Sequence, residues 1–271
     1  MTDLNPQAAQ MADESMVRNL AAQIEAIWPQ EVELFGRYGL AGDIDVLDAG
    51  CGTGEASIRI AALYPRARVL GVDILDEHLA RARARAAGSS PRLSFEHRSI
   101  YELGLPDRSF DLTVCRHVLH SIPHPERAIA ELARVTKPGG RLHLIPEDYD
   151  MLHFPRGTPD PRDFWHAVPD RFGQRTETDL FVGRHAFTIL QQLGLADITL
   201  DYVVVDTLRV PRDVFARIIS AWRDGYTEPS AEVMGWTIER TREYFDRMID
   251  SIRDPMHYAV WMVPVLAARV P

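Results

Sequence analysis

Val46-Leu47-Asp48-Ala49-Gly50-Cys51-Gly52-Thr53-Gly54 is the stretch from which the fold of this chain can be predicted. The apolar run at residues 44–47 predicts a buried strand, and residues 55–63 follow with a helical pattern. Glycine accepts positive φ and has no Cβ, so the turn between them lets a ligand approach bare backbone. The helix adds unpaired N–H groups and the positive end of its dipole. The stretch therefore predicts a ligand-binding strand, turn and helix.

The spacing of the glycines distinguishes between two kinds of ligand. A dinucleotide loop has the form G-x-G-x-x-G, and its third glycine packs the helix against the sheet. Here glycines stand at positions 50, 52 and 54, Asp48 precedes them, and position 55 is not glycine. The spacing therefore disfavours an NAD-dependent oxidoreductase, which remains the least favoured alternative.

Composition and charge limit the class of protein. The 271 residues are 46% hydrophobic and 25% charged, as in a soluble globular protein with one α/β domain and additions. A formal net charge of −9 argues against nucleic acid as the main partner. Neither a membrane span nor a signal peptide is recognisable, and Cys51 and Cys115 are too few for a disulfide framework. We expect a cytoplasmic monomer or homodimer without a membrane partner.

Strands and helices alternate through the middle of the chain. The predicted strands are residues 44–47, 67–72, 93–97, 110–115 and 141–145, and the predicted helices are residues 55–63, 75–87 and 125–135. A turn at residues 137–140 is predicted to end the last helix. This alternation predicts an α/β fold with a parallel sheet covered by helices on both faces. Ligands of such sheets bind outside the carboxyl ends of the strands, where the glycine loop lies.

Residues 13–40 have apolar side chains at three- and four-residue steps, which predicts amphipathic helices. Pro29 predicts the start of a second short helix over residues 30–38. Two roles remain open for this segment. It either covers only the edge of the sheet, or it also lies over the ligand cleft.

Four ordered motifs resemble those of a known family. They are the D-x-G-x-G-x-G loop at 48–54, L-P-D-R-S-F-D at 105–111, H-V-L-H-S-I-P at 117–123 and E-L-A-R-V-T-K-P-G-G at 131–140. With this order and spacing, residues 44–147 resemble the class I S-adenosylmethionine-dependent methyltransferases, in the ubiquinone-biosynthesis-type branch that acts on small molecules. The resemblance implies a Rossmann-like sheet of seven strands whose last strand is antiparallel. It also implies S-adenosylmethionine as cofactor, S-adenosylhomocysteine as product and a place in secondary metabolism.

The resemblance implies where the cofactor binds. The glycine loop would hold the methionine part, and Ile74 would lie against the adenine. Asp73 could accept hydrogen bonds from both ribose hydroxyls, because it follows Gly54 by 19 residues at the end of the second strand. The alternative role for Asp73, a helix N-cap, is better suited to Asp76. The family often has an acidic residue after the third strand, where this chain has Arg98-Ser99-Ile100, so Ser99 or backbone would contact the adenine. The expected cofactor-binding residues are Asp48, Gly50, Cys51, Gly52, Gly54, Asp73, Ile74, Ser99, Ile100, Cys115 and Arg116.

Beyond residue 147 the resemblance fades. Residues 179–193 predict a helix, and residues 198–205 and 258–267 predict the strands that complete the sheet. The insertion at 211–256 predicts two helices, residues 212–223 and 231–252, joined through Gly225 and Pro229. The expected parts are an N-terminal helical cap (1–42), a cofactor-binding core (43–147), a lid (148–178 and 211–256) and the remaining core elements (179–210 and 257–271).

The lid is rich in aromatic residues that could wall an apolar or aromatic substrate. The substrate-pocket candidates are Trp28, Glu147, Tyr149, Trp165, Trp222, Tyr226 and Trp236. The alternative is that the aromatic side chains only fix the lid onto the sheet. A lid of this size favours a small-molecule substrate.

Methyl transfer depends mainly on holding the nucleophile in line with the methyl group, and a base is needed only for a protonated acceptor. The base candidates are His117 and His120, which would share one face of a helical turn, and Tyr149. For each of these three residues, the alternative to catalysis is a structural role in packing or hydrogen bonding. Residues 147–150 offer oxygen ligands for Mg²⁺, but no acidic residue follows the fourth strand, so we expect no metal. The sequence thus predicts O-, N- or C-methylation of a small apolar or aromatic metabolite. The alternative is a cofactor-binding scaffold that acts as a pericyclase or decarboxylase, or binds a partner, without transferring methyl.

Overall fold

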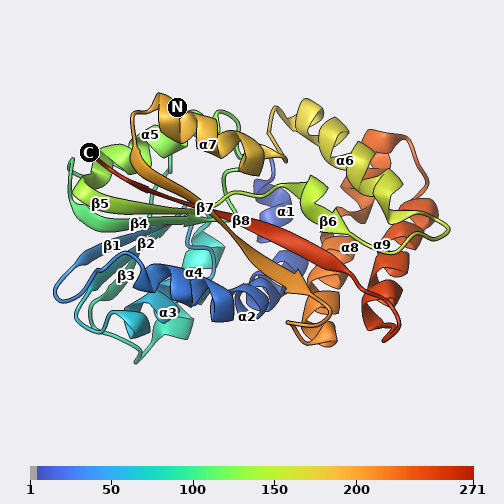
Figure 1. Cartoon of the computed structure of the whole chain (residues 1–271), viewed down its shortest axis with the longest axis horizontal. Coiled ribbons are helices and arrows are strands. Elements are labelled where there is room, and N and C mark those ends of the chain that lie inside the picture. The colour runs from blue at the N-terminus through green and yellow to red at the C-terminus, as the bar shows by residue number, and fades with distance from the viewer. Residues whose placement is uncertain (1–4) are drawn as a thin grey trace.

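One sheet organises the computed structural model, which describes residues 5–271 (Figure 1). The strands are β1 (Asp45–Ala49), β2 (Arg68–Asp73), β3 (Leu93–His97), β4 (Phe110–Arg116), β5 (Thr136–Ile145), β6 (Leu152–His153), β7 (Ala196–Asp206) and β8 (Val260–Arg269). Their order is β3-β2-β1-β4-β5-β8-β6, and β7 pairs with the other edge of β8. β1 to β5 are parallel, whereas β8 is antiparallel to β5 and β7. The predicted mostly parallel, Rossmann-like sheet with an antiparallel last strand is confirmed.

Helices alternate with strands from β1 to β3 and again from β4 to β5, whereas the other helices stand before β1 or follow β5 in pairs. The helices are α1 (Ala8–Ala12), α2 (Glu14–Gly36), α3 (Glu55–Leu63), α4 (Asp76–Ala86), α5 (Pro125–Val135), α6 (Pro161–Thr176), α7 (Val182–Gln192), α8 (Arg212–Met234) and α9 (Ile238–Arg253). The sheet has one strand more than predicted, because β6 has two residues and is too short to give an alternating pattern. Residues 1–4 of the predicted N-terminal cap lie outside the described residues.

Helices cover both faces of the sheet because successive side chains of a strand point in opposite directions. Val46 and Val114 pack with α2 and α3, whereas Leu47 and Cys115 pack with α5 and α7. A strand that is buried on both faces needs a nearly continuous apolar run, and residues 44–47 show this pattern except at Asp45, which is only partly buried. The parallel core could therefore be predicted from local sequence.

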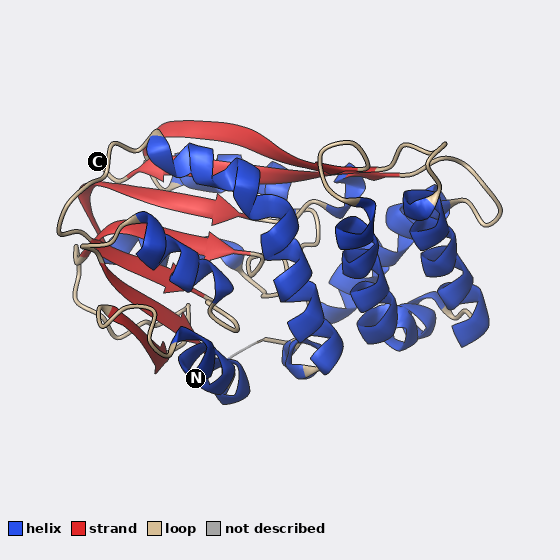
Figure 2. Ribbon diagram, turned by 90° about the horizontal axis from the view of Figure 1, so that it is seen from below, coloured by secondary structure: helices blue, strands red, loops and turns tan. Residues whose placement is uncertain are grey.

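A second group of helices lies beyond the carboxyl ends of the strands (Figures 1 and 2). α6, α8 and α9 pack there around a core that includes Phe164, Phe215 and Phe245. β7 and β8 extend from the main sheet into this group, and the fully buried Trp261 of β8 lies in its core. Among residues 5–271, no helix combines the length and apolar character needed to cross a membrane.

Two predicted helix breaks are wrong. α2 continues through Pro29, and the buried Ile27 and Phe35 lie on either side of the proline. α8 continues through Gly225 and Pro229. A Cβ at Gly225 would lie 2.7 Å from the Ser15 hydroxyl oxygen, so this glycine allows α8 to approach α2 closely. A proline inside a helix costs about 3 kcal/mol, because it removes one hydrogen bond and its ring clashes with the preceding turn. The burial of apolar side chains along α2 and α8 outweighs this cost.

The turn predicted at residues 137–140 is also wrong, because β5 begins at Thr136 and includes these residues. Thr136 pairs with Phe110 of β4, and the N–H of Gly139 donates to the Val270 carbonyl at 2.8 Å. Gly139 has φ of +80°, which glycine adopts without strain, so a strand can pass through a sequence that is typical of a turn.

Candidate active site

The glycine loop is held against β2 at the carboxyl edge of the sheet. The N–H groups of Gly50 and Cys51 both donate to the Val72 carbonyl, at 2.8 and 2.9 Å. Gly50 has φ of +75°, and a Cβ built there would lie 2.3 Å from a methyl carbon of Val118. Gly54 has φ of +83°, and its Cβ would lie 2.9 Å from that of Ala82 in α4. Gly50 thus brings bare backbone close to Val118, whereas Gly54 allows close packing with α4.

Two adjoining cavities open beside this loop, and together we call them the glycine-loop cleft. The larger cavity is lined by Asn5, Met11, Leu20, Gly50, Gly52, Asp73, Ile74, Leu75, His78, Arg98, Ile100, Arg116, His117, Val118, Ser121 and Ile122. The smaller cavity is lined by Leu20, Gln23, Ile24, Asp48, Gly50, Cys51, Gly52, Glu55, Ala56, Arg116 and His117. The cleft therefore brings together side chains from α2 and residues at the carboxyl ends of β1, β2 and β4.

Asp73 occupies the end of β2 beside the loop. One of its carboxylate oxygens accepts from the N–H of Gly52 at 2.8 Å, and the other accepts from the N–H of Leu75 at 3.0 Å. Each oxygen keeps a second lone pair for a ligand. The prediction that Asp76 caps α4 is wrong, since Asp76 is the first residue of the helix and Asp73 binds the N–H of the N-cap residue, Leu75.

Asp48 and Cys51 have buried side chains on the inner side of the loop. The Ser57 hydroxyl donates to the Asp48 carboxylate at 2.6 Å. Burial raises the pKa of Asp48 to about 6, and it raises the pKa of the Cys51 thiol well above its usual value. Cys51 therefore stays protonated at neutral pH, and its place next to Gly71 is one of packing.

Arg116 at the end of β4 is held by an acidic residue that no sequence motif indicates. The guanidinium donates to both carboxylate oxygens of Glu31 on α2, at 2.7 and 2.8 Å. The ring of His143 lies 3.1 Å from the same carboxylate, and the Tyr38 hydroxyl lies 2.7 Å from the other ring nitrogen. Burial alone would raise the pKa of Glu31, but Arg116 and His143 lower it to about 2. The network joins α2 to two strands.

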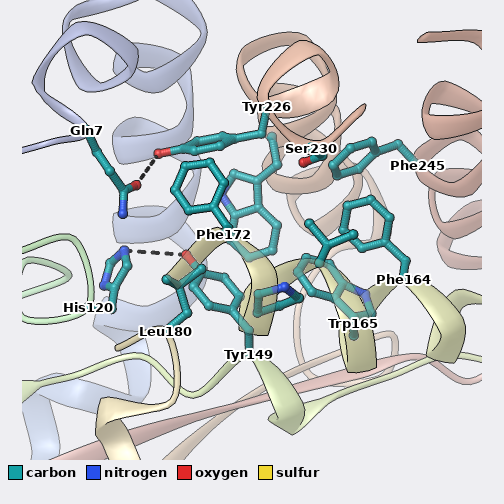
Figure 3. Close-up of a pocket in the computed structure, with 13 residues that line it drawn as sticks. Gln7, His120, Tyr149, Phe164, Trp165, Phe172, Leu180, Tyr226, Ser230 and Phe245 are labelled. Atoms are coloured by element: carbon teal, nitrogen blue, oxygen red, sulfur yellow. Dashed lines mark hydrogen bonds between the residues drawn. The ribbon is translucent and has the colours of Figure 1, made fainter. Parts of the chain in front are cut away.

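A separate cavity lies among η1 (Tyr149–Met151), α6 and α8, and we call it the aromatic cavity (Figure 3). It is lined by Gln7, His120, Tyr149, Phe164, Trp165, Val168, Pro169, Phe172, Leu180, Trp222, Tyr226, Ser230 and Phe245. Tyr149 stacks on Trp165, with ring centroids 5.7 Å apart and an interplanar angle of 4°. The structure thus gathers four of the substrate-pocket candidates, Tyr149, Trp165, Trp222 and Tyr226, around one space.

Other candidates lie elsewhere. Trp28 packs against Phe35, with ring centroids 5.6 Å apart, in the core between α2 and α3. Trp236 stacks on Tyr244, with ring centroids 5.0 Å apart, and Arg240 lies over its ring. Trp28 lies in α2, and Trp236 lies between α8 and α9. Both side chains pack against other aromatic rings and do not line the aromatic cavity.

Three of the expected cofactor contacts do not line the cleft, and the first is Gly54, which packs against Ala82 of α4. Cys115 is fully buried in the core formed with α5 and α7, because it points to the opposite face of β4 from Val114. Ser99 accepts a hydrogen bond from the N–H of Tyr101 at 3.3 Å, while its neighbours Arg98 and Ile100 line the cleft.

His117 connects the glycine-loop cleft to a buried carboxylate. It has φ of +57°, and its Nδ1 is hydrogen-bonded to Glu147 at the end of β5. Both side chains are buried. His117 lines both cavities of the cleft, and its buried Nε2 atom has no hydrogen-bond partner among residues 5–271. Glu147 thus lies behind His117 and does not line the aromatic cavity.

His120 faces the aromatic cavity instead. Its Nε2 lies 3.5 Å from the Tyr149 hydroxyl, and burial lowers its pKa to about 4. The prediction that His117 and His120 share one face is wrong, because the segment between β4 and α5 is not helical and His117 has a positive φ. Within the described residues, no group of three or more His, Cys, Asp or Glu side chains has the arrangement of a metal site.

Comparison with known proteins relates the part of the chain that builds the glycine-loop cleft to methyltransferases. Residues 46–140 match the model of a methyltransferase domain. The 27-O-demethylrifamycin SV methyltransferase of Amycolatopsis mediterranei is 40% identical over 119 residues, which are 43% of this chain and 42% of that protein. The trans-aconitate 2-methyltransferase of Deinococcus radiodurans is 34% identical over 158 residues, or 57% of this chain and 59% of that protein. The chain therefore spans about half the length of these curated relatives.

Solved structures agree on the fold. A Haemonchus contortus phosphoethanolamine N-methyltransferase 2, in complex with phosphomonomethylethanolamine and S-adenosylhomocysteine, has a TM-score of 0.63 at 16% identity over 100% of this chain and 60% of its own. A putative methyltransferase from Bacillus halodurans C-125 has a TM-score of 0.59 at 18% identity, over 90% of this chain and 99% of its own. The [4+2]-cyclase SpnF has a TM-score of 0.54 at 23% identity, over 95% of this chain and 80% of its own. At these identities the likeness is one of fold.

Proposed function

Because residues 46–140 match a methyltransferase domain, we propose that the chain is a class I S-adenosylmethionine-dependent methyltransferase, which binds S-adenosylmethionine in the glycine-loop cleft and methylates a small apolar or aromatic molecule in the aromatic cavity. The proposal rests on one observation, which is that the glycine-loop cleft and the aromatic cavity lie next to each other. Val118, Ser121 and Ile122 line the cleft, while His120 in the same short segment lines the cavity. Residues 43–147 hold the cofactor in this proposal, and residues 148–178 and 211–256 cover the acceptor.

The residues of the cleft fit an S-adenosylmethionine molecule. The bare backbone at Gly50 and Gly52 suits its amino-acid tail, and the buried Gln23 carbonyl oxygen lacks a partner among residues 5–271. Asp73 has lone pairs for the ribose hydroxyls, and Ile74 and Ile100 supply apolar surface for the adenine. Arg116 is already paired with Glu31, so we assign it to shaping the cleft.

The residues of the chain contribute positioning, exclusion of water and proton transfer. The bound cofactor supplies an electrophilic methyl group on a sulfonium. The stacked rings of Tyr149 and Trp165 hold the acceptor, and holding two reactants in line can lower a barrier by roughly 7–11 kcal/mol. Where the acceptor begins protonated, we assign the base to His117 Nε2, so the reacting atom of the acceptor has to reach from the aromatic cavity into the glycine-loop cleft that His117 lines. Glu147 holds the His117 Nδ1 proton and stabilises the charged ring.

Titration calorimetry and methyl transfer test the proposal. We expect S-adenosylmethionine and S-adenosylhomocysteine to bind at a 1:1 ratio and NAD not to bind. Transfer of a labelled methyl group to members of a panel of small aromatic molecules should follow. Binding without transfer to any acceptor would favour the scaffold alternative, and binding of NAD instead would overturn the proposal.

Gly50→Ala is expected to weaken S-adenosylhomocysteine binding by about 30-fold or more, because overpacking costs typically ~1–3 kcal/mol and the positive φ adds strain. The new methyl group would collide with Val118, and the loop would have to move away from β2. Gly88→Ala is the matched control, since Gly88 has φ of +81° and open space where a Cβ would stand. Calorimetry should show wild-type affinity for Gly88→Ala, and equal affinities of both variants would contradict the assignment of the loop.

A further inference from the structure

We propose that the acceptor is an uncharged aromatic molecule and that Gln7 selects it by donating a hydrogen bond from its side-chain amide. The inference rests on the proposed function, because it takes the aromatic cavity as the acceptor site. Gln7 precedes α1, in the N-terminal segment, and lines the cavity together with His120. No sequence motif pointed to this residue.

The lining of the cavity excludes a charged acceptor. Among the described residues that line it, none is an aspartate, glutamate, lysine or arginine. His120 is neutral at pH 7, because burial lowers its pKa to about 4. A carboxylate, phosphate or ammonium group would lose its hydration here without gaining a partner of opposite charge, which is unfavourable.

Gln7 is a buried polar group with an unused donor. Its side-chain carbonyl oxygen accepts from the Tyr226 hydroxyl at 2.9 Å, while the amide nitrogen has no partner within the described chain. The residue is only 2% exposed, so water is not freely available to that nitrogen. Buried donors in proteins are nearly always hydrogen-bonded, so a ligand acceptor is the expected partner.

Two of the polar side chains, Gln7 and His120, lie on one wall of the cavity, whereas Ser230 lies near Phe245 (Figure 3). In Figure 3 the side chains of Gln7 and His120 lie on the same side, and Phe164 and Phe245 lie across from them. The Nδ1 of His120 is a second buried atom that the residues of the structure leave without a hydrogen bond. Met11, one turn along from Gln7 in α1, lines the glycine-loop cleft. The polar end of an acceptor would thus face the cofactor.

The remaining walls are flat and aromatic. Trp222 meets Tyr149 and Trp165 edge-on, with ring centroids 5.6 and 5.8 Å away. Rings in offset or edge-on contact favour an aromatic guest over an aliphatic one. A cation could also be attracted to such ring faces, but the cavity offers no carboxylate to accompany it.

Four matched probes test the charge and the hydrogen bond in the presence of S-adenosylhomocysteine at pH 7. They are 3-hydroxyacetophenone, 3-ethylphenol, 3-hydroxybenzoate and 3-hydroxybenzylamine. Quenching of the intrinsic tryptophan fluorescence, to which Trp165 and Trp222 of the cavity contribute, reports binding. We expect the ketone to bind about 5–10-fold more tightly than 3-ethylphenol, the size of one net hydrogen bond. The anionic and cationic probes should bind at least ~10-fold more weakly than the ketone.

Substitution of Gln7 measures how much of the preference for the ketone comes from this residue. Gln7→Leu, and Gln7→Met as a second variant, should reduce the preference for the ketone over 3-ethylphenol to less than ~2-fold. Gln10→Leu, in α1 just after Gln7 but outside the cavity, should keep the wild-type preference. Tight binding of a charged probe, failure of both neutral probes to bind, or survival of the ketone preference in the Gln7 variants would overturn the inference. Calorimetry with S-adenosylhomocysteine alone separates any of these results from a failure of the cofactor proposal.

Discussion

Glu31→Ala is expected to lower the free energy of unfolding by about 3–5 kcal/mol, because it leaves the Arg116 guanidinium buried without its partner. The side chain of Arg116 is 9% exposed and that of Glu31 is fully buried, so water cannot replace the lost carboxylate. His143 also loses an acceptor. Urea unfolding followed by circular dichroism measures the change.

Glu25→Ala is the matched control on the same helix. Glu25 pairs with Arg217 at 2.7 Å, but both side chains are 51% exposed, and such surface pairs contribute about 0–1 kcal/mol. A loss of similar size in the two variants would contradict the importance of the buried network. The double substitution Glu31→Leu with Arg116→Met should be less destabilising than Glu31→Ala, because it removes both charges.

The same network predicts part of the response to acid. The pKa of Glu31 is lowered from an ordinary 4.5 to about 2, so the unfolded chain binds its proton first as the pH falls. The stabilisation is complete above pH 4.5 and is lost as the pH falls from 4.5 through 2, by an amount of order 3 kcal/mol. Glu31→Gln should therefore show a shallower loss of stability over this range.

His117→Asn is expected to reduce kcat for a phenolic acceptor by roughly 10²–10⁴-fold, the usual contribution of a general base. Asparagine tolerates the positive φ of this position, so the substitution tests the imidazole and not the backbone. His124→Asn is the matched control, because His124 has φ of +52° and an exposed side chain. It should keep the wild-type kcat.

Glu147→Gln distinguishes positioning from simple packing. The amide can still accept the hydrogen bond from His117 Nδ1, but it no longer stabilises a positive charge on the ring. We expect kcat to fall and its pH profile to change, whereas His124→Asn should keep the wild-type profile. An unaltered rate in both His117→Asn and Glu147→Gln would exclude His117 as the base.

The parts of the fold that could be predicted depend on contacts between residues close in sequence. The glycine loop, the alternating strands and the end of β2 at Asp73 each produce a local pattern, which is why the parallel core was predicted. Gly225 and Pro229 show the opposite case. Their local preference is for a break, but α8 is continuous through both, and Gly225 packs closely against Ser15, which lies far away in the sequence.

The site could be predicted only where it follows the motifs. Gly50, Gly52, Asp73 and Ile74 line the cleft as expected, since the strand order alone brings them to one edge. Gln7 and Glu31 could not be found in this way. Each is one polar residue in an amphipathic or irregular segment, and its burial depends on elements that come much later in the chain. A buried polar residue leaves no periodic signal of its own.

The pairing of β7 with β8 has a mechanical consequence for the helices that surround the aromatic cavity. The two strands are paired from Ala196–Arg269 to Asp206–Val260, and Val203 and Trp261 belong to the core formed with α8 and α9. A hinge between those helices and the main sheet would have to bend this ladder or break its hydrogen bonds. The paired strands resist bending. Tilting the helices would therefore also displace β7, which contacts α2, and β8, which contacts β5.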